Sequence, residues 1–174
     1  RLAVASSIDR DSLLTALNSG DKAATSWVPG EIPSSNTAIG LKYDPALAAR
    51  EWKKVDTKAG AFLLGFYSSS KNQMIAEKVR DDVKKTTGVG LELRNRDWKT
   101  YVRELSVNTP GIYRFGFLSV FGDPFASLFL FESGNPNNYT GWKNPKFDAL
   151  LAKLAAMDSK KMAERQKVVD QAQK

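Results

Sequence analysis

One short run of residues has the spacing of a covalent catalyst. Ser68-Ser69-Ser70-Lys71 matches S-x-x-K, in which a serine opens a helix and a lysine one turn later tunes its proton affinity. The S-D-N and K-T-G sequences that accompany this motif in penicillin-binding enzymes do not occur in the chain. Serines before a helix are normally capping residues. Capping is therefore the preferred interpretation, and a Ser-Lys acyl hydrolase remains an alternative.

The sequence contains few of the residues that other catalytic sites and metal sites require. The chain has no cysteine and no histidine, which excludes disulfides, the common zinc sites and Ser-His or Cys-His pairs. The acidic pairs are Asp9 with Asp11 and Asp81 with Asp82. Neighbours such as Asp81 and Asp82 do not face each other on a helix, so they cannot share one site. Solvated surface carboxylates are the preferred interpretation. We expect no metal and no cofactor.

The basic charge does not predict nucleic-acid binding. The formal net charge is +7, but the lysines are scattered among acidic residues instead of forming one block. Residues 98–101 interleave aromatic and basic side chains, which could suggest base stacking. The apolar residues here lie at i, i+3, i+4 and i+7, the spacing of a helix face that packs on a core: Trp98, Tyr101, Val102 and Leu105. Core packing is the preferred interpretation.

The composition is that of a globular protein. The chain has 174 residues, 42% of them hydrophobic and 26% charged, enough to bury a core. Its most apolar passage, 113–131, is no membrane span, because Arg114, Asp123 and Pro124 interrupt it. The chain opens at Arg1 without a methionine and ends without a helix stop, so we expect a piece of a longer protein.

The pattern of elements predicts an α/β fold. Strands are expected at 61–66, 89–93 and 111–118. Helices are expected at 9–18, from Pro45, at 71–86, from Asp97, at 124–131, from Pro145, and from about 159 to the end. A long polar loop at 19–44 should be functional or wrap another part of the protein. Strands separated by helices favour a sheet with at least partly parallel pairing.

Arg114 is the strongest single candidate for a binding residue. It lies in an expected strand that otherwise reads as buried on both faces, and guanidinium groups are rarely buried without a partner. One interpretation is an internal salt bridge. The other is that Arg114 lies near the carboxyl end of the strand, where open α/β sheets bind ligands, and takes an anionic group. The sequence leaves both open.

Four blocks follow one another in a recognisable order: "LAVASSIDRDSLL", "YDPALAAREWKK", "LLGFYSSSKNQMIAEKVRDDVKKTTGVGLELRNRDWKTYVREL" and "NNYTGWKNPKFDALLAKLAA". With them the chain closely resembles the carboxy-terminal large lobe of the family 5 extracellular solute-binding proteins, the oligopeptide-, dipeptide- and nickel-binding components of ABC importers. The resemblance implies a type II periplasmic-binding-protein-like lobe, with a mixed sheet flanked by helices and incomplete at both ends. Residues 1–174 would form a single lobe of a two-lobed protein.

The same resemblance implies where ligand binds. Peptide-binding members carry a strand like "G-W-x-x-D-Y-x-x-P", whose aspartate pairs with the amino terminus of the peptide. Here Gly116, Phe117, Leu118 and Ser119 match main-chain positions, and Val120 replaces the aspartate. Valine cannot neutralise an ammonium group, which puts recognition of a free amino terminus in question.

Two more candidates follow from the resemblance. Arg114 matches an arginine that lies near the ligand carboxylate in some oligopeptide binders. Trp27, in the long loop, is a further expected contact.

The expected function is that of the substrate-binding component of an ABC importer, which captures peptides or peptide-like solutes for a membrane permease. We expect a protein that is not an enzyme and is monomeric, with a periplasmic or lipid-anchored location. A ligand-sensing receptor of the same fold that does not transport is the other alternative, and the sequence does not separate the two.

Overall fold

The computed structural model describes residues 1–55, 62–118 and 121–174. They form two compact units, each drawn from two stretches of the chain. Unit 1 contains residues 1–23 and 41–116, and unit 2 contains residues 24–40 and 117–174. Within the described residues, no helix combines the length and the apolarity needed to cross a bilayer.

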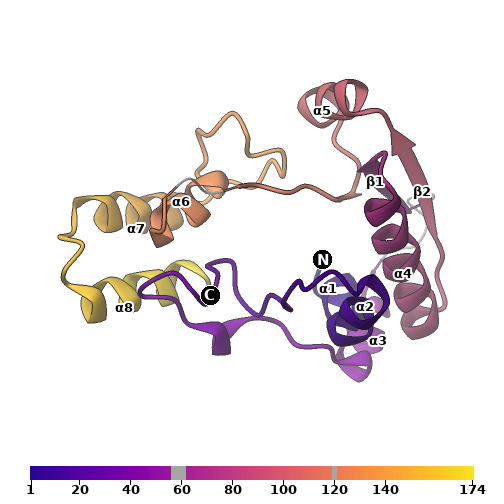
Figure 1. Cartoon of the computed structure of the whole chain (residues 1–174), viewed down its shortest axis with the longest axis horizontal. Coiled ribbons are helices and arrows are strands. Elements are labelled where there is room, and N and C mark those ends of the chain that lie inside the picture. Colours follow the sequence, from indigo (N-terminus) through magenta and orange to yellow (C-terminus); the bar gives the residue numbers. More distant parts are fainter. Residues whose placement is uncertain (56–61, 119–120) are drawn as a thin grey trace. The chain divides into compact units, whose positions relative to one another are not determined.

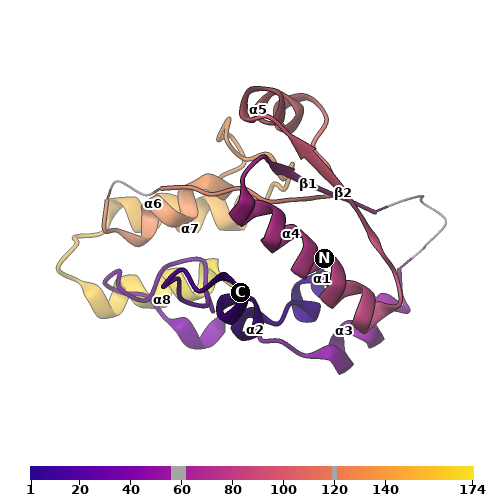
Figure 2. The same ribbon diagram turned by 45° about the vertical axis from the view of Figure 1, so that its right-hand side comes forward.

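Unit 1 is an α/β layer, as the sequence predicts. Its elements in chain order are α1 (Leu2–Ser7), α2 (Arg10–Leu17), α3 (Pro45–Trp52), β1 (Phe62–Tyr67), α4 (Ser70–Thr87), β2 (Leu91–Arg96), α5 (Trp98–Val107) and β3 (Ile112–Tyr113). The described strands form one sheet in the order β2-β1-β3, and both pairings are parallel. Helix α4 runs along this sheet, and α1, α2 and α3 pack on the side of α4 that faces away from the sheet (Figure 1 and Figure 2).

Both faces of β1 are covered, which explains its unbroken apolar sequence. Leu64 and Phe66 point to one face, since alternate residues of a strand share a face. There they join the core that α4 covers, which consists of Leu64, Phe66, Ala76, Val79, Val83 and Leu91. Gly65 points to the opposite face, where a Cβ atom would lie 2.8 Å from Pro110 and 3.5 Å from the Tyr101 ring of α5. A larger residue than glycine would therefore separate α5 from the sheet.

Unit 2 is helical. Its elements are the 3₁₀ helix η1 (Thr37–Ile39), α6 (Pro124–Leu128), the 3₁₀ helix η3 (Phe129–Phe131), α7 (Pro145–Ala156) and α8 (Met162–Ala172). Its core consists of Val28, Leu128, Phe147, Leu151, Leu154, Val168 and Val169. The side-chain oxygen of Gln173 accepts hydrogen bonds from the backbone N–H groups of Trp27 (2.8 Å) and Val28 (3.2 Å). The long loop thus wraps the helices of unit 2, one of the two roles expected for it.

Most helices begin at the positions that the capping residues of the sequence predict. The carboxylates of Asp44, Asp97 and Asp123 accept the backbone N–H groups of Leu47, Thr100 and Phe125. These bonds satisfy amides that the first helical turn leaves unpaired.

Four expectations need correction. The strand expected at 111–118 is only β3, two residues long, and Arg114 follows its end. Strand β2 begins and ends later than 89–93, at Leu91–Arg96. The helix expected at 124–131 changes to 3₁₀ geometry after Leu128. The last helix begins at Met162, not 159, because Asp158 caps a turn by accepting the N–H of Lys160.

Candidate ligand-binding site

The candidate site is built where the parallel strands of unit 1 end. The register pairs Tyr67, the last residue of β1, with Arg96, the last residue of β2. Arg114 directly follows β3, and its N–H donates to the Gly65 carbonyl at 2.8 Å. In open α/β sheets this edge is where ligands bind. Arg114 therefore lies near the carboxyl end of β3, as one of the two sequence interpretations expects, but one residue beyond the strand. Its role in binding an anionic group stays a prediction.

The Arg114 side chain lies beside the Tyr67 ring of β1 and close to the backbone at Gly116. Its guanidinium carbon lies 5.8 Å from the centre of the Tyr67 ring, within the range of a cation–π contact. A Cβ atom on Gly116 would lie 2.8 Å from the Arg114 Nη1 atom. The glycine thus leaves room for the guanidinium close to the backbone.

One nitrogen of this guanidinium has unused hydrogen-bonding capacity. Arg114 Nη1 is buried and has no hydrogen-bond partner in the described part of the chain. The ion pairs found among residues 1–55, 62–118 and 121–174 do not include Arg114, so the internal salt bridge is not observed there. An unpaired buried donor is costly, and an anionic ligand would satisfy it.

A second cation and a carboxylate belong to the same unit. Lys71, in the first turn of α4, lies 2.5 Å from the Asp21 carboxylate. Hydrogen bonds from Lys71 and Ser19, together with the positive charge of Arg114, hold the pKa of Asp21 below its usual value. Asp21 therefore stays ionised and offsets part of the positive charge around Arg114.

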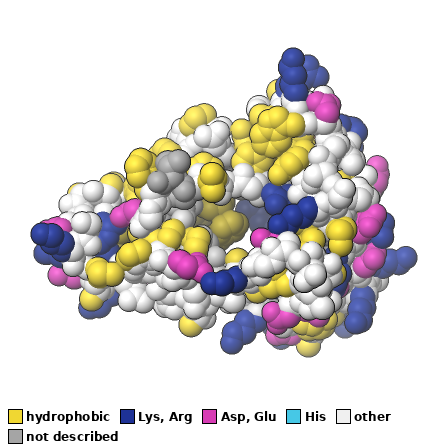
Figure 3. Space-filling model, in the orientation of Figure 1, with side chains coloured by type: hydrophobic (Ala, Val, Ile, Leu, Met, Phe, Trp, Pro, Cys, Tyr) yellow, Lys and Arg dark blue, Asp and Glu magenta, His cyan; other side chains and the backbone are white. Residues whose placement is uncertain are grey.

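Aromatic side chains surround the Arg114 segment. The Trp98 ring meets the Tyr67 ring edge-on at 5.0 Å and stacks on Phe115 at 6.2 Å. Trp98 is 54% exposed, so its expected place in the core is wrong, whereas Tyr101 and Leu105 of the same stripe are buried. Figure 3 shows hydrophobic side chains gathered beside α5 on this face. Sequence reasoning missed Trp98 as a surface residue because its helical spacing is the same as that of the buried Tyr101 and Leu105.

The other site residues predicted from the sequence belong to unit 2 or lie outside the described residues. Phe117 and Leu118 are exposed, at 50% and 86%. Trp27 is also exposed, and its ring meets that of Phe131 edge-on at 4.6 Å. Ser119 and Val120 lie outside the described residues. Within unit 1, the structure brings together Arg114 and Gly116 and adds Tyr67, Lys71 and Trp98 to them.

Asp123 makes its polar contacts within unit 2. It caps α6, and its carboxylate pairs at 2.6 Å with Arg165, whose side chain is 6% exposed. Arg165 also donates to the carbonyls of Leu154 and Met157. The interpretation of Asp123 as a helix cap is therefore confirmed, and its charge is already matched.

The S-x-x-K motif is not arranged for acyl transfer. Ser69, not Ser68, is the N-cap of α4 and accepts the N–H of Asn72. The Ser68 hydroxyl lies 2.5 Å from the Asn95 side-chain oxygen and 3.0 Å from the Arg96 carbonyl. Lys71, the required base, pairs with Asp21. In the described part of the chain, no group of three or more acidic, histidine or cysteine side chains is placed to hold a metal.

A depression lies beside α5, but Arg114 does not line it. Its walls are Arg96, Thr100, Arg103, Glu104, Val107 and Asn108. The Glu104 carboxylate in this depression already contacts Arg94 at 2.8 Å and Arg96 at 3.6 Å, so it offsets much of the positive charge of the depression. The strand edge, where Arg114 Nη1 has no hydrogen-bond partner among the described residues, is the better candidate for binding an anion.

These features describe an α/β module with a candidate ligand edge at the carboxyl ends of its strands. The chain belongs to the bacterial extracellular solute-binding proteins, family 5, whose model for the middle region matches residues 1–139. It is 31% identical over 164 residues to the oligopeptide-binding protein OppA of Bacillus subtilis, covering 87% of this chain and 30% of that one. It is 27% identical over 174 residues to the periplasmic murein peptide-binding protein MppA of Escherichia coli, covering 92% and 32%.

Solved structures agree with this assignment. The structure of E. coli MppA superposes with a TM-score of 0.88 at 22% identity, over 99% of this chain and 35% of that one. CtaP of Listeria monocytogenes, an ABC transporter substrate-binding protein, gives 0.84 at 25% identity, over 99% and 36%. The α/β, periplasmic-binding-protein-like fold is thus confirmed. The chain spans about a third of the length of these relatives.

Proposed function

We propose that the chain is part of one lobe of a two-lobed substrate-binding component of an ABC importer. The whole protein would capture peptides or peptide-like solutes between its lobes and deliver them to permease subunits in the membrane. Closure would be stabilised by contacts that only the ligand-bound state makes. Both compact units, residues 1–174, would belong to the same lobe.

The observation that carries this proposal is the unpaired guanidinium of Arg114 at the carboxyl edge of the sheet. Nη1 is buried without a hydrogen-bond partner in the described residues, while Tyr67 and Gly116 fix its surroundings. An Arg–carboxylate contact is charge-assisted and stronger than a neutral hydrogen bond. Arg114 would therefore take a carboxylate of the ligand, and the main chain at Gly116, Phe117, Leu118 and Ser119 would bond the peptide backbone.

Two further residues would bear on ligand recognition. Val120 would leave a free amino terminus without a counter-ion, so amino-blocked ligands should be accepted as well as free ones. The exposed Trp27 ring would contact a ligand side chain.

The names of the relatives support the proposed location and the proposed lack of catalysis. Several of them are named as periplasmic oligopeptide- or murein peptide-binding proteins, which supports an extracytoplasmic location, periplasmic or lipid-anchored. They are named as binding proteins, which supports a role without catalysis. The pairing of Lys71 with Asp21 supports it too. We also propose a monomer that needs no cofactor and does not bind nucleic acid.

Native mass spectrometry of the full-length protein as purified tests this function. Denaturation should release a heterogeneous set of short peptides. Arg114→Met should lose those with a free carboxylate, and Arg103→Met, which removes an exposed arginine from the same unit, should keep them. A single non-peptide mass from the wild type would contradict the proposed substrate class.

A further inference from the structure

Tyr101 reaches from α5 to the point where the chain leaves the sheet. Its side chain is 0% exposed, and its hydroxyl donates toward two carbonyl oxygens, that of Arg114 at 2.8 Å and that of Gly65 at 3.0 Å. The Arg114 N–H donates to the same Gly65 carbonyl at 2.8 Å. The peptide groups on both sides of the Arg114 Cα atom are therefore fixed, one by β1 and the other by the phenol.

This contact continues the sheet where its ladder has ended. Strand β3 is only two residues long, and its register with β1 stops at Gly65 opposite Tyr113. If β3 were one residue longer, the Arg114 carbonyl would bond within the ladder. Here the Tyr101 hydroxyl donates to that carbonyl instead. The direction in which Arg114 projects its side chain depends on these peptide groups, because they set its φ and ψ angles.

The Tyr101 ring also contacts the ring that lies beside the guanidinium. The centres of the Tyr101 and Tyr67 rings are 5.9 Å apart, and Arg114 lies 5.8 Å from the Tyr67 ring. Tyr101 thus acts on Arg114 through the backbone and through Tyr67. Burial raises the pKa of the Tyr101 phenol above its ordinary value of 10.0, so the hydroxyl keeps its proton at neutral pH and remains a donor.

A phenylalanine could fill the same place in the core but could not make these bonds. The apolar stripe of α5 needs only a buried ring at this position. A buried tyrosine hydroxyl must find a partner, and here both partners are main-chain atoms of the segment that precedes the proposed ligand strand.

We propose that Tyr101 is a positioning residue for ligand recognition: its hydroxyl holds the Arg114 carbonyl and so orients the guanidinium before ligand arrives. The proposal rests on the proposed role of Arg114 in binding a carboxylate. Tyr101 itself would not touch the ligand.

The first test needs no ligand and uses the full-length protein. Tyr101→Phe should speed amide hydrogen exchange of residues 112–118 by about tenfold, the effect of losing one buried hydrogen bond. Tyr43→Phe, which removes an exposed hydroxyl from the same unit, should leave it unchanged. Unchanged exchange in Tyr101→Phe would overturn the proposal, whatever the protein binds.

The second test measures binding of two synthetic random tripeptide libraries, one with free carboxylates and one amidated. Tyr101→Phe should weaken binding of the free-acid library about tenfold and that of the amidated library less than twofold. In an Arg114→Met background the same substitution should have no further effect, because the two residues act as one unit.

The outcomes separate the two proposals. Equal loss for both libraries, or a loss that persists in the Arg114→Met background, would show that the phenol does not act through Arg114. If the wild type does not distinguish the two libraries, the carboxylate role of Arg114 fails and the orienting role in recognition fails with it. Faster exchange at 112–118 would still show that the hydroxyl fixes this segment.

Discussion

Among single residues, Gly116 has the closest steric relation to the proposed site. A Cβ atom there would lie 2.8 Å from Arg114 Nη1, closer than such contacts normally are. The crowded atom is the end of a flexible side chain, so the guanidinium can move aside at little cost in stability. The loss should therefore appear in binding and not in folding.

Gly116→Ala should weaken binding of free-acid tripeptides about tenfold while changing the unfolding free energy by less than about 0.5 kcal/mol. Isothermal titration and urea denaturation of the full-length protein measure the two effects. Gly111→Ala is the matched control, since nothing lies within 4 Å of a Cβ atom at that position. Similar binding losses in both variants would argue against the steric explanation.

The ion pair of Lys71 with Asp21 gives a prediction about titration. The pKa of Asp21 is lowered from 3.8, chiefly by the hydrogen bond from Lys71, and additionally by Ser19 and Arg114. A carboxyl whose pKa is lowered by folding stabilises the protein above its unfolded pKa. That contribution is lost as the pH falls through the pKa of Asp21 in the folded protein. Because this pKa lies below 3.8, the ion pair should persist at pH values somewhat below 3.8.

Lys71→Met should raise the pKa of Asp21 toward 3.8 without reaching it, because Ser19 and Arg114 still act on the carboxylate. Carboxyl ¹³C chemical shifts followed between about pH 2 and 6 measure this change, since that range brackets an ordinary aspartate pKa. Lys99→Met, which removes a lysine from α5, should leave the titration of Asp21 unchanged. An unaltered curve in Lys71→Met would contradict the assigned cause.

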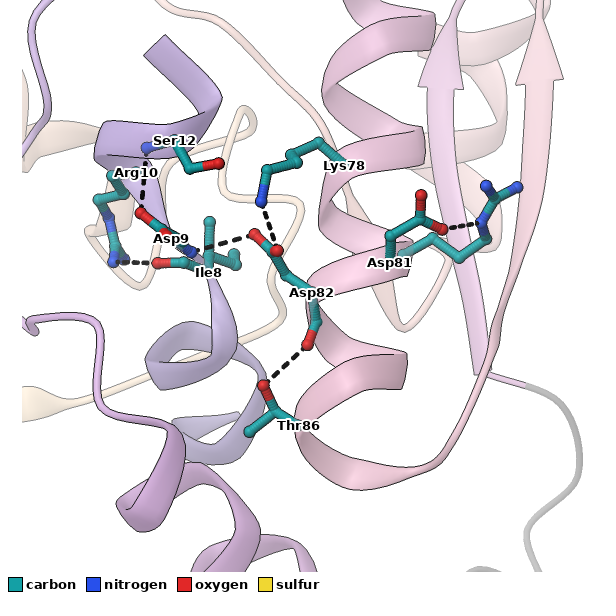
Figure 4. Close-up of polar contacts among 9 residues, drawn as sticks. Ile8, Asp9, Arg10, Ser12, Lys78, Asp81, Asp82 and Thr86 are labelled. Atoms are coloured by element: carbon teal, nitrogen blue, oxygen red, sulfur yellow. Dashed lines mark hydrogen bonds and ion pairs between the residues drawn. The ribbon is translucent and has the colours of Figure 1, made fainter. Parts of the chain in front are cut away.

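Between elements, Asp82 joins α4 to the start of α2. Its carboxylate accepts the backbone N–H of Asp9 at 3.1 Å and pairs with Lys78 one turn earlier (Figure 4). The neighbouring Asp81 points away and pairs with Arg80 at the surface. The sequence-based inference that these two carboxylates do not share a site is confirmed. Its corollary that both are solvated is wrong, because Asp82 is 8% exposed.

Asp82→Ala should lower the unfolding free energy by about 2 kcal/mol, since it leaves the Asp9 N–H without its acceptor and Lys78 without its partner. It should also speed amide exchange in residues 9–18. Asp81→Ala should cost less than about 0.5 kcal/mol. Equal costs in the two variants would mean that α2 does not depend on this contact.

The capped helices are the elements that the sequence predicts best. Asp44, Asp97 and Asp123 each precede a helical apolar pattern, and each accepts the amide that a cap must satisfy. Helix α1 was not predicted, because it is short and the residue at its N-cap, Arg1, makes no capping side-chain bond.

The strand at the candidate site was predicted less well, for a physical reason. Apolar residues such as Phe117 and Leu118 suggest burial, but pairing requires a neighbouring strand, and β3 pairs with β1 only at Ile112 and Tyr113. The sequence identified Arg114 because a charge in an apolar run is conspicuous. It could not identify Tyr101 as anything but core, since the hydroxyl partners are main-chain atoms far from it along the chain.

At the scale of the whole molecule, stability rests on two separate cores. Phe66 is 1% exposed in the core of unit 1, and Leu151 is 0% exposed in that of unit 2. Truncating either side chain removes apolar contacts and leaves a cavity in its own core.

Phe66→Ala should cost about 4 kcal/mol and Leu151→Ala about 3 kcal/mol in unfolding free energy. In hydrogen exchange, each variant should show its largest increase among the residues of its own unit. Leu118→Ala, at an exposed position, should change neither quantity by much. A variant whose largest increase fell in the other unit would contradict the division into two cores.

The wrapping of the long loop around α8 has a consequence for how the chain is made. The Trp27 N–H donates to the side-chain oxygen of Gln173, a residue 146 positions later. At a synthesis rate of about 5–20 residues per second, Val28 would wait on the order of 10 s for the helices that bury it. Contacts of such separation also close slowly, because loop entropy is lost before they form. Unit 2 can therefore be completed only after its last helix is synthesised, and a newly made chain leaves Val28 exposed until then.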